Sequence, residues 1–477
     1  MPQEYELQAE KKAFEINMDP RIYGAFAEIG AGQEVARRFF SVGGAAGTVA
    51  KTISAYDMTF SDAIYGACGR YVSRARLHSM LKHEYSLLIE RLDAKVGGVR
   101  TFFAFADTVA ARSFRRHAES QGWMGIIFQT EPRGETSEII IHVRMLDPRN
   151  LQQQEALGIV GVNLIYGAFF LRKNPEALVG SLLDDLGTGR IEIDMIRFSG
   201  PDFADVDDRI MALQLVTQNL TNAALFRADG EIVNAADALY KKPLLVERGS
   251  FRPVTLVADD MLNCARTMFM REETVKDAEP EILMEITMKN LLASGELDLR
   301  DFLDRVDMLG AMGRTVLISN YGAYYRLVNY LTRYTDSLIG LPLGIPAMAE
   351  ILEEEYYRDL EGGILEALGR LFKTGVKLYV YPFLNPNGDL VTAGNFEVAP
   401  ELVHLYTHLL ENGFIEPVEG HNPSYLPIKS SEVLAKIRAG APGWEQTVSP
   451  EVAKIIKERR LFGFRDEFAK QELNGKT

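Results

Sequence analysis

The spacing of apolar side chains predicts that the chain begins with a helical region. Within residues 1–95 apolar positions recur three or four residues apart, which is the period of an amphipathic helix. This spacing occurs at residues 36–40, 49–53 and 77–92. Two glycine-rich stretches interrupt it and predict breaks between helices. We therefore expect residues 1–95 to form a helical N-terminal region.

Strand-like patterns dominate the next region, residues 96–240. Short runs rich in β-branched and aromatic side chains lie at residues 101–109, 125–132, 137–147 and 190–198. The longer apolar stretch at 156–171 predicts a helix buried inside the domain. It is too short to span a bilayer, because a spanning helix needs about 20 apolar residues. Strands and buried helix together predict a mixed α/β domain.

The pattern is most regular in residues 241–415, where strand-like runs alternate with helical stretches of about 10 to 15 residues. The runs lie at residues 243–248, 314–320, 337–344 and 376–382. This alternation is typical of βαβ crossovers and predicts a parallel, doubly wound, Rossmann-like sheet. Such sheets bind ligands at the carboxyl ends of their strands. Residues 416–477 predict a helical C-terminal extension, and the fold class is α/β.

Composition narrows the classes of partner. The chain has 477 residues, of which 47% are hydrophobic, and this length predicts more than one domain. Lys and Arg number 52 against 66 Asp and Glu, so the net charge is −14. An acidic surface repels phosphate backbones and anionic lipids, and the nearest basic run is the short segment 112–117. We therefore expect neither nucleic acid nor a membrane as a partner.

Cysteine usage and the first residues indicate the compartment. Cys68 and Cys264 are far apart and have no metal-binding spacing, and unpaired thiols are typical of a reducing environment. The first residues (MPQEYELQAEKKAF) are charged and lack the apolar core of a secretory signal. We expect a cytoplasmic protein.

The glycine-rich segment 43–52 (GGAAGTVAKT) is the first candidate binding site. Backbone amides freed by glycine can bind a phosphate, and a Lys-Thr pair can neutralise it and hold magnesium. The P-loop pattern is not met, because Ala50 stands where that pattern requires glycine. Close helix packing at small residues is the alternative interpretation. The residues of this anion loop would be Gly43, Gly44, Gly47, Lys51 and Thr52.

The second candidate site is the segment 249–255 (GSFRPVT), which follows a predicted strand and opens a predicted helix. It resembles the first motif of the nucleotidylyltransferases that adenylylate nicotinamide mononucleotide or phosphopantetheine. Arg252 stands where that family usually has aspartate, and Val257 and Ala258 replace its Gly-His. The residues that match are Gly249, Ser250, Phe251, Pro253 and Thr255.

The resemblance implies nucleotidyl transfer, with magnesium accompanying a nucleotide, but the histidine most needed for catalysis is missing. The alternative is a helix N-terminus that binds a phosphate or carboxylate, with Arg252 as the counter-charge. Ile318-Ser319-Asn320, together with Arg326, is a faint echo of the family's second motif. The predicted binding residues are Gly249, Ser250, Phe251, Arg252, Thr255, Ser319 and Asn320.

Three longer segments, 25–58, 158–170 and 245–255, resemble an uncharacterised bacterial family. Its members carry the automatic labels nicotinamide-nucleotide adenylyltransferase or TonB-dependent receptor. The resemblance covers nearly the full length and implies no established activity. The receptor label conflicts with the sequence, which lacks a series of alternating strands of about ten residues.

Tyrosines cluster after the strand predicted at 314–320. Tyr321, Tyr324 and Tyr325 occupy one turn, and Tyr330 and Tyr334 follow. Aromatic side chains at the end of a parallel strand can stack on a base or sugar. Packing against the sheet or against a partner subunit is the alternative.

Three function classes remain. The first is an enzyme acting on a nucleotide or a phosphorylated small metabolite, with segment 249–255 as its anion site. The second is a sensor that holds such a ligand without chemistry. The third is a self-assembling cytoplasmic scaffold, supported by the small-residue helices and by the lack of a complete catalytic or metal-binding set in the sequence. We expect a small-molecule ligand and a homo-oligomer, and we assign no metal site.

Overall fold

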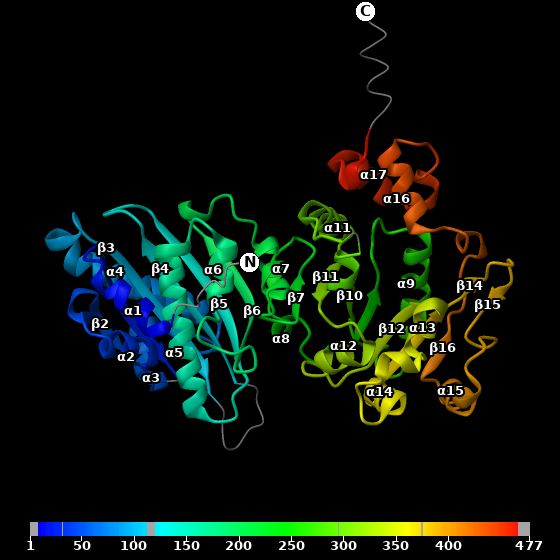
Figure 1. Cartoon of the computed structure of the whole chain (residues 1–477), viewed down its shortest axis with the longest axis horizontal. Helices are drawn as coiled ribbons and strands as arrows, with labels where there is room; N and C mark the ends of the chain where they lie inside the picture. The colour runs from blue at the N-terminus through cyan, green and yellow to red at the C-terminus, as the bar shows by residue number, and fades with distance from the viewer. Residues whose placement is uncertain (1–7, 31, 112–119, 294, 374, 466–477) are drawn as a thin grey trace, which may run out of the picture. The chain divides into compact units, whose positions relative to one another are not determined.

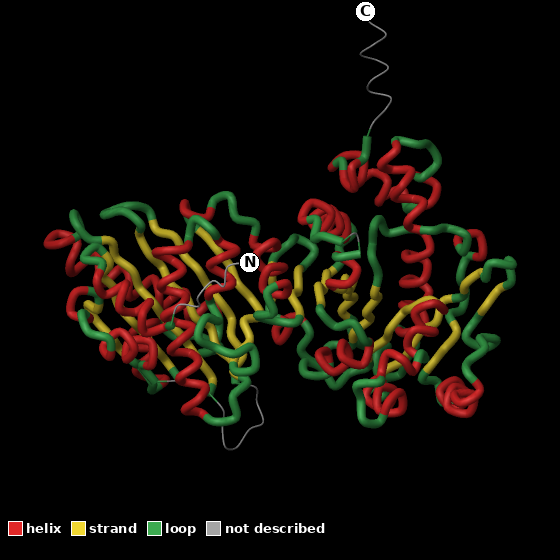
Figure 2. Tube along the Cα trace, viewed as in Figure 1, coloured by secondary structure: helices red, strands yellow, loops and turns green. Residues whose placement is uncertain are grey.

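The chain is an α/β protein of two compact units, Met1–Ala224 and Leu225–Thr477 (Figure 1). The computed structural model describes residues 8–30, 32–111, 120–293, 295–373 and 375–465. Figure 2 shows the strands of each sheet with helices lying against them. The predicted fold class is confirmed. Residues 1–95 and 96–240, predicted as separate regions, contribute strands to one sheet, and the basic segment 112–117 lies outside the described residues.

Unit 1 is built on a six-stranded mixed sheet with the order β2-β1-β3-β4-β5-β6. β1 pairs in parallel with β2 and β3, and the remaining neighbours are antiparallel. Its strands are β1 (Ile22–Ile29), β2 (Val49–Ile53), β3 (Thr101–Ala110), β4 (Gln121–Gln129), β5 (Thr136–Met145) and β6 (Ile191–Ser199). Its helices are α1 (Ala9–Met18), α2 (Glu34–Ser41), α3 (Met58–Tyr65), α4 (Arg74–Val96), α5 (Asn150–Tyr166), α6 (Pro175–Ser181) and α7 (Asp208–Thr217).

The helical prediction for residues 1–95 is wrong at two places, because residues 22–29 form β1 and residues 49–53 form β2. The sequence of β2, VAKTI, contains three β-branched residues, which favour the extended backbone. Over only five residues, apolar spacing fits a helix and a strand equally well. The parallel partner β1 decides the outcome.

Helices cover both faces of the unit 1 sheet. Along β3 the side chains alternate, so Phe103 and Phe105 join the core cluster of α5, whereas Phe102 packs with Leu88 of α4. The helix Asn150–Leu171 is long and apolar enough to cross a membrane, yet 72% of its apolar window is buried inside the protein. The predicted buried helix is therefore confirmed.

Unit 2 is built on an eight-stranded sheet with the order β16-β13-β12-β9-β10-β11-β7-β8. Its strands are β7 (Ala223–Phe226), β8 (Ile232–Val233), β9 (Leu244–Arg248), β10 (Glu281–Thr287), β11 (Thr315–Ser319), β12 (Ile339–Gly344), β13 (Val376–Tyr381) and β16 (Ile415–Pro417), with β14 (Phe383–Leu384) and β15 (Leu390–Val391) in a separate pair. Its helices are α8 (Ala235–Ala238), α9 (Leu256–Phe269), α10 (Met288–Leu291), α11 (Leu299–Ala311), α12 (Tyr324–Leu331), α13 (Ile345–Ile351), α14 (Gly363–Leu371), α15 (Val403–Glu411), α16 (Ser430–Ala439) and α17 (Pro450–Arg459).

The strand order of unit 2 is that of a doubly wound dinucleotide-binding fold. Strands β9 to β13 and β16 form parallel pairs, and in chain order their arrangement is 3-2-1-4-5-6. The order reverses between β9 and β12, which makes this point the topological switch. The predicted Rossmann-like sheet is confirmed, and ligands of such sheets bind beyond the carboxyl ends of the strands.

One central strand of unit 2 was not predicted. The sequence indicated a charged connector and then a helix before Gly313, but residues 281–287 (EILMEIT) form β10 beside β9. Two glutamates obscure the strand pattern, and both have partners across the sheet. Glu281 pairs with Lys242 at 2.7 Å, and Glu285 pairs with Arg248 at 2.7 Å. Compensated charges allow a polar sequence to lie inside a sheet.

We expect the turn after β1 to be intolerant of any side chain. Gly30 has φ +107°, and a Cβ there would lie 1.9 Å from the backbone oxygen of Val109. Gly43 has φ +84° and open space around it, so it carries the same backbone constraint without the clash. Gly30→Ala should lower the free energy of unfolding by about 2 kcal/mol more than Gly43→Ala. Urea unfolding followed by circular dichroism measures this, and equal losses in the two variants would contradict it.

Candidate functional site

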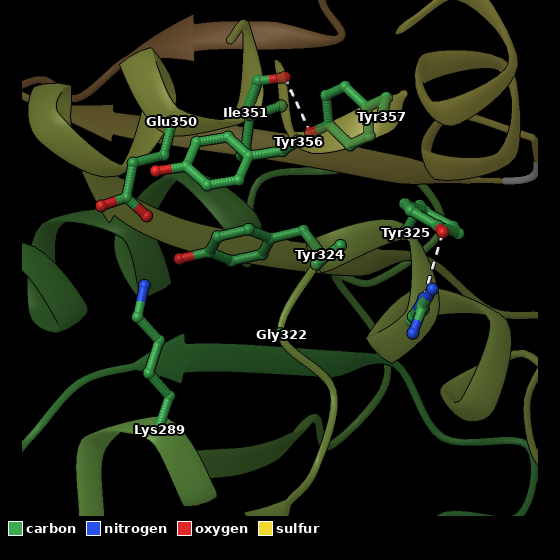
Figure 3. A pocket seen from close by; sticks show the side chains of 10 residues that line it. Lys289, Gly322, Tyr324, Tyr325, Glu350, Ile351, Tyr356 and Tyr357 are labelled. Atoms are coloured by element: carbon green, nitrogen blue, oxygen red, sulfur yellow. Dashed lines mark hydrogen bonds between the residues drawn. The ribbon is translucent and has the colours of Figure 1, made fainter. Parts of the chain in front are cut away.

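A pocket of about 250 Å³ lies beside the carboxyl ends of the strands in unit 2 (Figure 3). Lys289 comes from α10, directly after β10, and the loop before α12 follows β11. The far wall comes from the end of α13 and the turn after it. The residues that line the pocket are Lys289, Gly322, Ala323, Tyr324, Tyr325, Arg326, Glu350, Ile351, Tyr356 and Tyr357.

The pocket combines aromatic rings with three charged side chains, those of Lys289, Arg326 and Glu350. Tyr324 is 8% exposed and Tyr356 is 61% exposed, and within the described part of the chain neither stacks on another ring. Figure 3 shows both rings, with the Lys289 amine pointing toward the side where the Glu350 carboxylate lies. Among the described residues no ion pair involves Lys289 or Glu350, whereas the Arg326 Nε donates to the Tyr325 hydroxyl at 3.0 Å. Lys289 and Glu350 are therefore available to a ligand.

Burial raises the pKa values of two tyrosines at this site. Burial raises the pKa of the Tyr324 phenol above its ordinary value, although the charge of Arg248 opposes the shift. Burial also raises the pKa of Tyr357 to about 12, and its hydroxyl donates to the Ile351 carbonyl at 2.9 Å. Both phenols remain protonated near neutral pH and act as hydrogen-bond donors.

Arg248, at the end of β9, forms hydrogen bonds with β10 and with the loop that follows β11. Its Nε and Nη2 donate to the two carboxylate oxygens of Glu285 at 2.7 and 3.0 Å. Its Nη1 donates to the Gly322 carbonyl at 2.7 Å, and Nη2 donates to the Tyr321 carbonyl at 2.8 Å. The guanidinium lies 4.2 Å from the centre of the Tyr324 ring. One side chain thus holds the loop that carries a pocket wall.

Ser319, one of the predicted binding residues, belongs to this network. Its hydroxyl is buried and donates to Glu285 Oε1 at 2.5 Å. The Ser319 backbone ends β11, and Asn320 follows as an exposed residue. The structure therefore connects Ser319 to the pocket through Glu285. Direct contact of Ser319 or Asn320 with a ligand remains a prediction.

The predicted segment 249–255 forms the turn between β9 and α9. Phe251 is buried, with φ +45°, and its ring lies where a side chain on Gly249 would be. The Arg252 Nε donates to Asp301 Oδ1 at 2.5 Å, so this guanidinium already has a carboxylate partner. Thr255 is buried at the start of α9 and makes no side-chain cap. The phosphate-binding role of the turn remains a prediction.

Backbone contacts tie the same turn to its neighbours. The Ser250 carbonyl accepts from Arg305 at 3.2 Å, and the Gly249 carbonyl accepts from Asn290 of α10 at 3.2 Å. α10 also carries Lys289 of the pocket. Of the predicted residues, the structure therefore brings Gly249 and Ser319 close to the elements that form the pocket.

The glycines of the predicted anion loop have partners within unit 1. The amide of Asn17 donates to the Gly43 carbonyl at 2.7 Å, and Arg100 donates to the Gly47 carbonyl at 2.5 Å. A side chain on Gly44 would meet Met18 of α1. These contacts fit the alternative interpretation of close packing at small residues.

Lys51 and Thr52, the other members of that loop, lie on β2. The Lys51 amine donates to Glu84 Oε2 at 2.6 Å, and Glu84 also accepts from the Tyr65 hydroxyl at 2.8 Å. Thr52 Oγ1 is buried without a hydrogen-bond partner. Lys51 thus neutralises a carboxylate of its own unit, and anion binding by this segment remains a prediction.

Sequence reasoning missed Lys289, Glu350 and Tyr356. Lys289 follows the strand that was not predicted, so its place at the edge of the sheet could not be recognised. Glu350 and Tyr356 lie in the segment 346–357, which reads as an ordinary charged helix. The signal that was available was the tyrosine cluster, whose members Tyr324 and Tyr325 do line the pocket.

Unit 1 contains a buried pair of acids on neighbouring parallel strands. Glu28 of β1 and Asp107 of β3 are partners in register, and they are 1% and 2% exposed. Glu28 accepts from the backbone amides of Val35 and Ala36, which begin α2. Burial raises the pKa of Glu28 to about 7, and burial together with the charge of Glu28 raises the pKa of Asp107 well above its ordinary value.

Comparisons with known proteins give little guidance. No family model and no curated protein matches this sequence. One solved structure that matches partly is a competence/damage inducible protein, CihA, from Agrobacterium tumefaciens, with 16% sequence identity and a TM-score of 0.23; the match covers 33% of this chain and 93% of that chain. A second is a CinA superfamily protein from Escherichia coli, with 14% sequence identity and a TM-score of 0.24; the match covers 35% of this chain and 91% of that chain. Another CinA superfamily protein from Enterobacter cloacae matches with 10% identity, TM-score 0.26, and 35% and 96% coverage. Similarity at this level carries no argument about function.

Among the described residues, no group of three His, Cys, Asp or Glu side chains could hold a metal ion.

We expect the Glu28–Asp107 pair to make stability depend on pH. Both pKa values are raised in the folded state, so this contribution to stability is complete below the ordinary carboxyl values and is lost as the pH rises toward 7. Asp107→Asn removes one charge and keeps an oxygen for the Ile29 amide. Between about pH 5 and pH 8, its free energy of unfolding should gain at least about 1 kcal/mol relative to wild type. Urea unfolding at both pH values measures this, and parallel pH curves for the two proteins would contradict it.

Proposed function

We propose that unit 2 binds a nucleotide or a related phosphorylated small metabolite in the tyrosine-lined pocket. The observation that carries the proposal is the pocket itself: a stacking surface and three charged side chains, Lys289, Arg326 and Glu350, at the carboxyl edge of a sheet with the order 3-2-1-4-5-6. Small-molecule sites of doubly wound folds lie at this edge. The fold indicates where a ligand would bind, and the side chains of the pocket indicate the chemical class of that ligand.

A planar ring would stack on the face of Tyr324. This tyrosine is buried and the Arg248 guanidinium packs against its ring, so the ring offers a fixed surface. Tyr356 is largely exposed and supplies an adjustable second wall. Stacking of a base on an aromatic side chain contributes about 1–3 kcal/mol.

The charged groups would bind the polar parts of the ligand. Lys289 would pair with a phosphate, because an ammonium group serves as a point charge for phosphate. Glu350 would accept hydrogen bonds from ribose hydroxyls or a ring amino group. The volume of about 250 Å³ lies just below the usual range of small-molecule pockets, about 300–1,000 Å³, and favours a mononucleotide over a dinucleotide.

The proposal concerns binding, and a protein that binds such a ligand could be either an enzyme that transforms it or a sensor that only holds it. An enzyme of the nucleotidylyltransferase type would place phosphates against the turn at 249–255, where Arg252 is already paired with Asp301. A sensor would need only the pocket. The contacts of Arg252 favour the sensor, and transfer would require Arg252 to exchange Asp301 for a phosphate.

A second candidate function, a self-assembling cytoplasmic scaffold, rests on a different observation. Tyr56, Met58 and Phe60 of unit 1 are 72%, 61% and 57% exposed, and they lie close together in the sequence at the start of α3. Exposed apolar side chains that gather on one surface are typical of protein–protein contacts. Homo-oligomerisation through this surface is compatible with ligand binding by unit 2.

We expect Tyr356→Ala to weaken the binding of adenosine monophosphate about tenfold, because one stacking wall is lost. Lys289→Gln should weaken it by a similar factor, because the phosphate loses one of the two cations in the pocket lining, the other being Arg326. Tyr240→Ala is the matched control, since Tyr240 is 62% exposed and does not line the pocket.

Isothermal titration calorimetry of the full chain measures these affinities. Titrations with adenosine monophosphate, nicotinamide mononucleotide, NAD and ribose 5-phosphate, each with and without magnesium, identify the preferred ligand class. Absence of binding across this panel, or equal effects of Tyr356→Ala and Tyr240→Ala, would refute the proposed site.

A further inference from the structure

Arg248 and Glu285 are more elaborately connected than a simple ion pair. Glu285 is fully buried, and its two oxygens accept from Arg248 and from the Ser319 hydroxyl. The guanidinium in turn donates to two successive carbonyls, those of Tyr321 and Gly322. These contacts connect the ends of β9, β10 and β11.

The residues held by this network are those that begin the pocket wall. Gly322 lines the pocket, and Tyr324 follows two residues later as the first residue of α12. The Arg248 guanidinium lies 4.2 Å from the centre of the Tyr324 ring. The Tyr324 ring is therefore held by the Arg248 guanidinium against one of its faces. The backbone that leads to Tyr324 is held by the hydrogen bonds to the Tyr321 and Gly322 carbonyls.

We propose that Arg248, oriented by Glu285 and Ser319, is a positioning residue that preforms the stacking surface of Tyr324. This inference rests on the proposed binding of a nucleotide in the pocket. Arg248 itself does not line the pocket, so it acts on the ligand only through Tyr324 and the 321–323 loop. A preformed surface reduces the conformational entropy lost on binding and so increases affinity.

The geometry requires arginine. A planar guanidinium can hold a carboxylate with two parallel hydrogen bonds, donate to two carbonyls in its plane and offer a flat face to an aromatic ring. A lysine amine keeps the charge but has three donors at a single point. Arg248→Lys therefore separates the effect of geometry from the effect of charge.

Two ligand probes distinguish positioning from general destabilisation. Adenosine monophosphate has a ring to stack, whereas ribose 5-phosphate has only the parts that Lys289 and Glu350 would bind. In Arg248→Lys the dissociation constant for adenosine monophosphate should rise about tenfold, and that for ribose 5-phosphate should change less than about twofold. Equal loss for both probes would overturn the positioning role.

Ser319→Ala is the milder variant in case Arg248→Lys does not fold. It removes one hydrogen bond to Glu285 without leaving an unpaired buried charge, and we expect a rise of about threefold in the dissociation constant for adenosine monophosphate. Thr335→Val is the matched control. It also removes a buried hydroxyl, one that donates to the Lys242 carbonyl before β9, at the opposite end of that strand.

Hydrogen exchange of the ligand-free full chain gives a readout that does not need a ligand. Backbone amides in the 322–324 segment should exchange faster in Arg248→Lys and Ser319→Ala, and at the wild-type rate in Thr335→Val. The Tyr321 amide is left out, because it donates directly to the Ser319 hydroxyl at 3.3 Å. If wild type binds neither probe, the proposed function fails while exchange still decides the positioning role. Unchanged exchange in both variants would overturn this inference whatever the affinities are.

Discussion

The buried ion pair between Arg248 and Glu285 is the interaction on which the site in unit 2 depends. Glu285 lies in a central strand with no exposure to solvent, and an unpaired carboxylate there would cost several kcal/mol. Arg248 removes this cost and fixes the ends of three adjacent strands at the same time. The strand order places the pair at the carboxyl edge, next to the point where the order reverses. The ion pair that compensates the buried Glu285 thus also holds the loop that leads into a wall of the pocket.

The sequence predicts most of unit 2, because most of its strands are short apolar runs that lie between helical segments. β9, β11, β12 and β13 were found in this way. β10 was not, because Glu281 and Glu285 interrupt the apolar pattern, and their cationic partners lie on other elements. In unit 1 the run at β2 was too short to distinguish period 2 from period 3.6. β1, which lies in the region predicted to be helical, was missed as well. The three errors have the same cause: the contacts that decide these strands are with partners distant in the sequence.

The site was predictable only in part for the same reason. The tyrosine cluster and Ser319 are visible in the sequence because they follow a recognisable strand. Lys289 follows the missed strand, and Glu350 is one acid among many on a charged helix. The partner of Arg252, Asp301, lies on α11 and cannot be inferred from the motif around segment 249–255. A short motif therefore predicts the backbone turn, but it does not predict whether the side chains of that turn are free to bind a ligand.

The most direct test of the central claim observes the tyrosines themselves. The full chain, labelled with ¹³C in its tyrosine rings, would be titrated with adenosine monophosphate and followed by nuclear magnetic resonance. Ring resonances assigned by single Tyr→Phe substitutions should shift for Tyr324 and Tyr356 and stay fixed for Tyr56 and Tyr240, which are exposed outside the pocket. Shifts confined to tyrosines outside the pocket, or no shifts at saturating ligand, would contradict the assignment of this edge as the binding site.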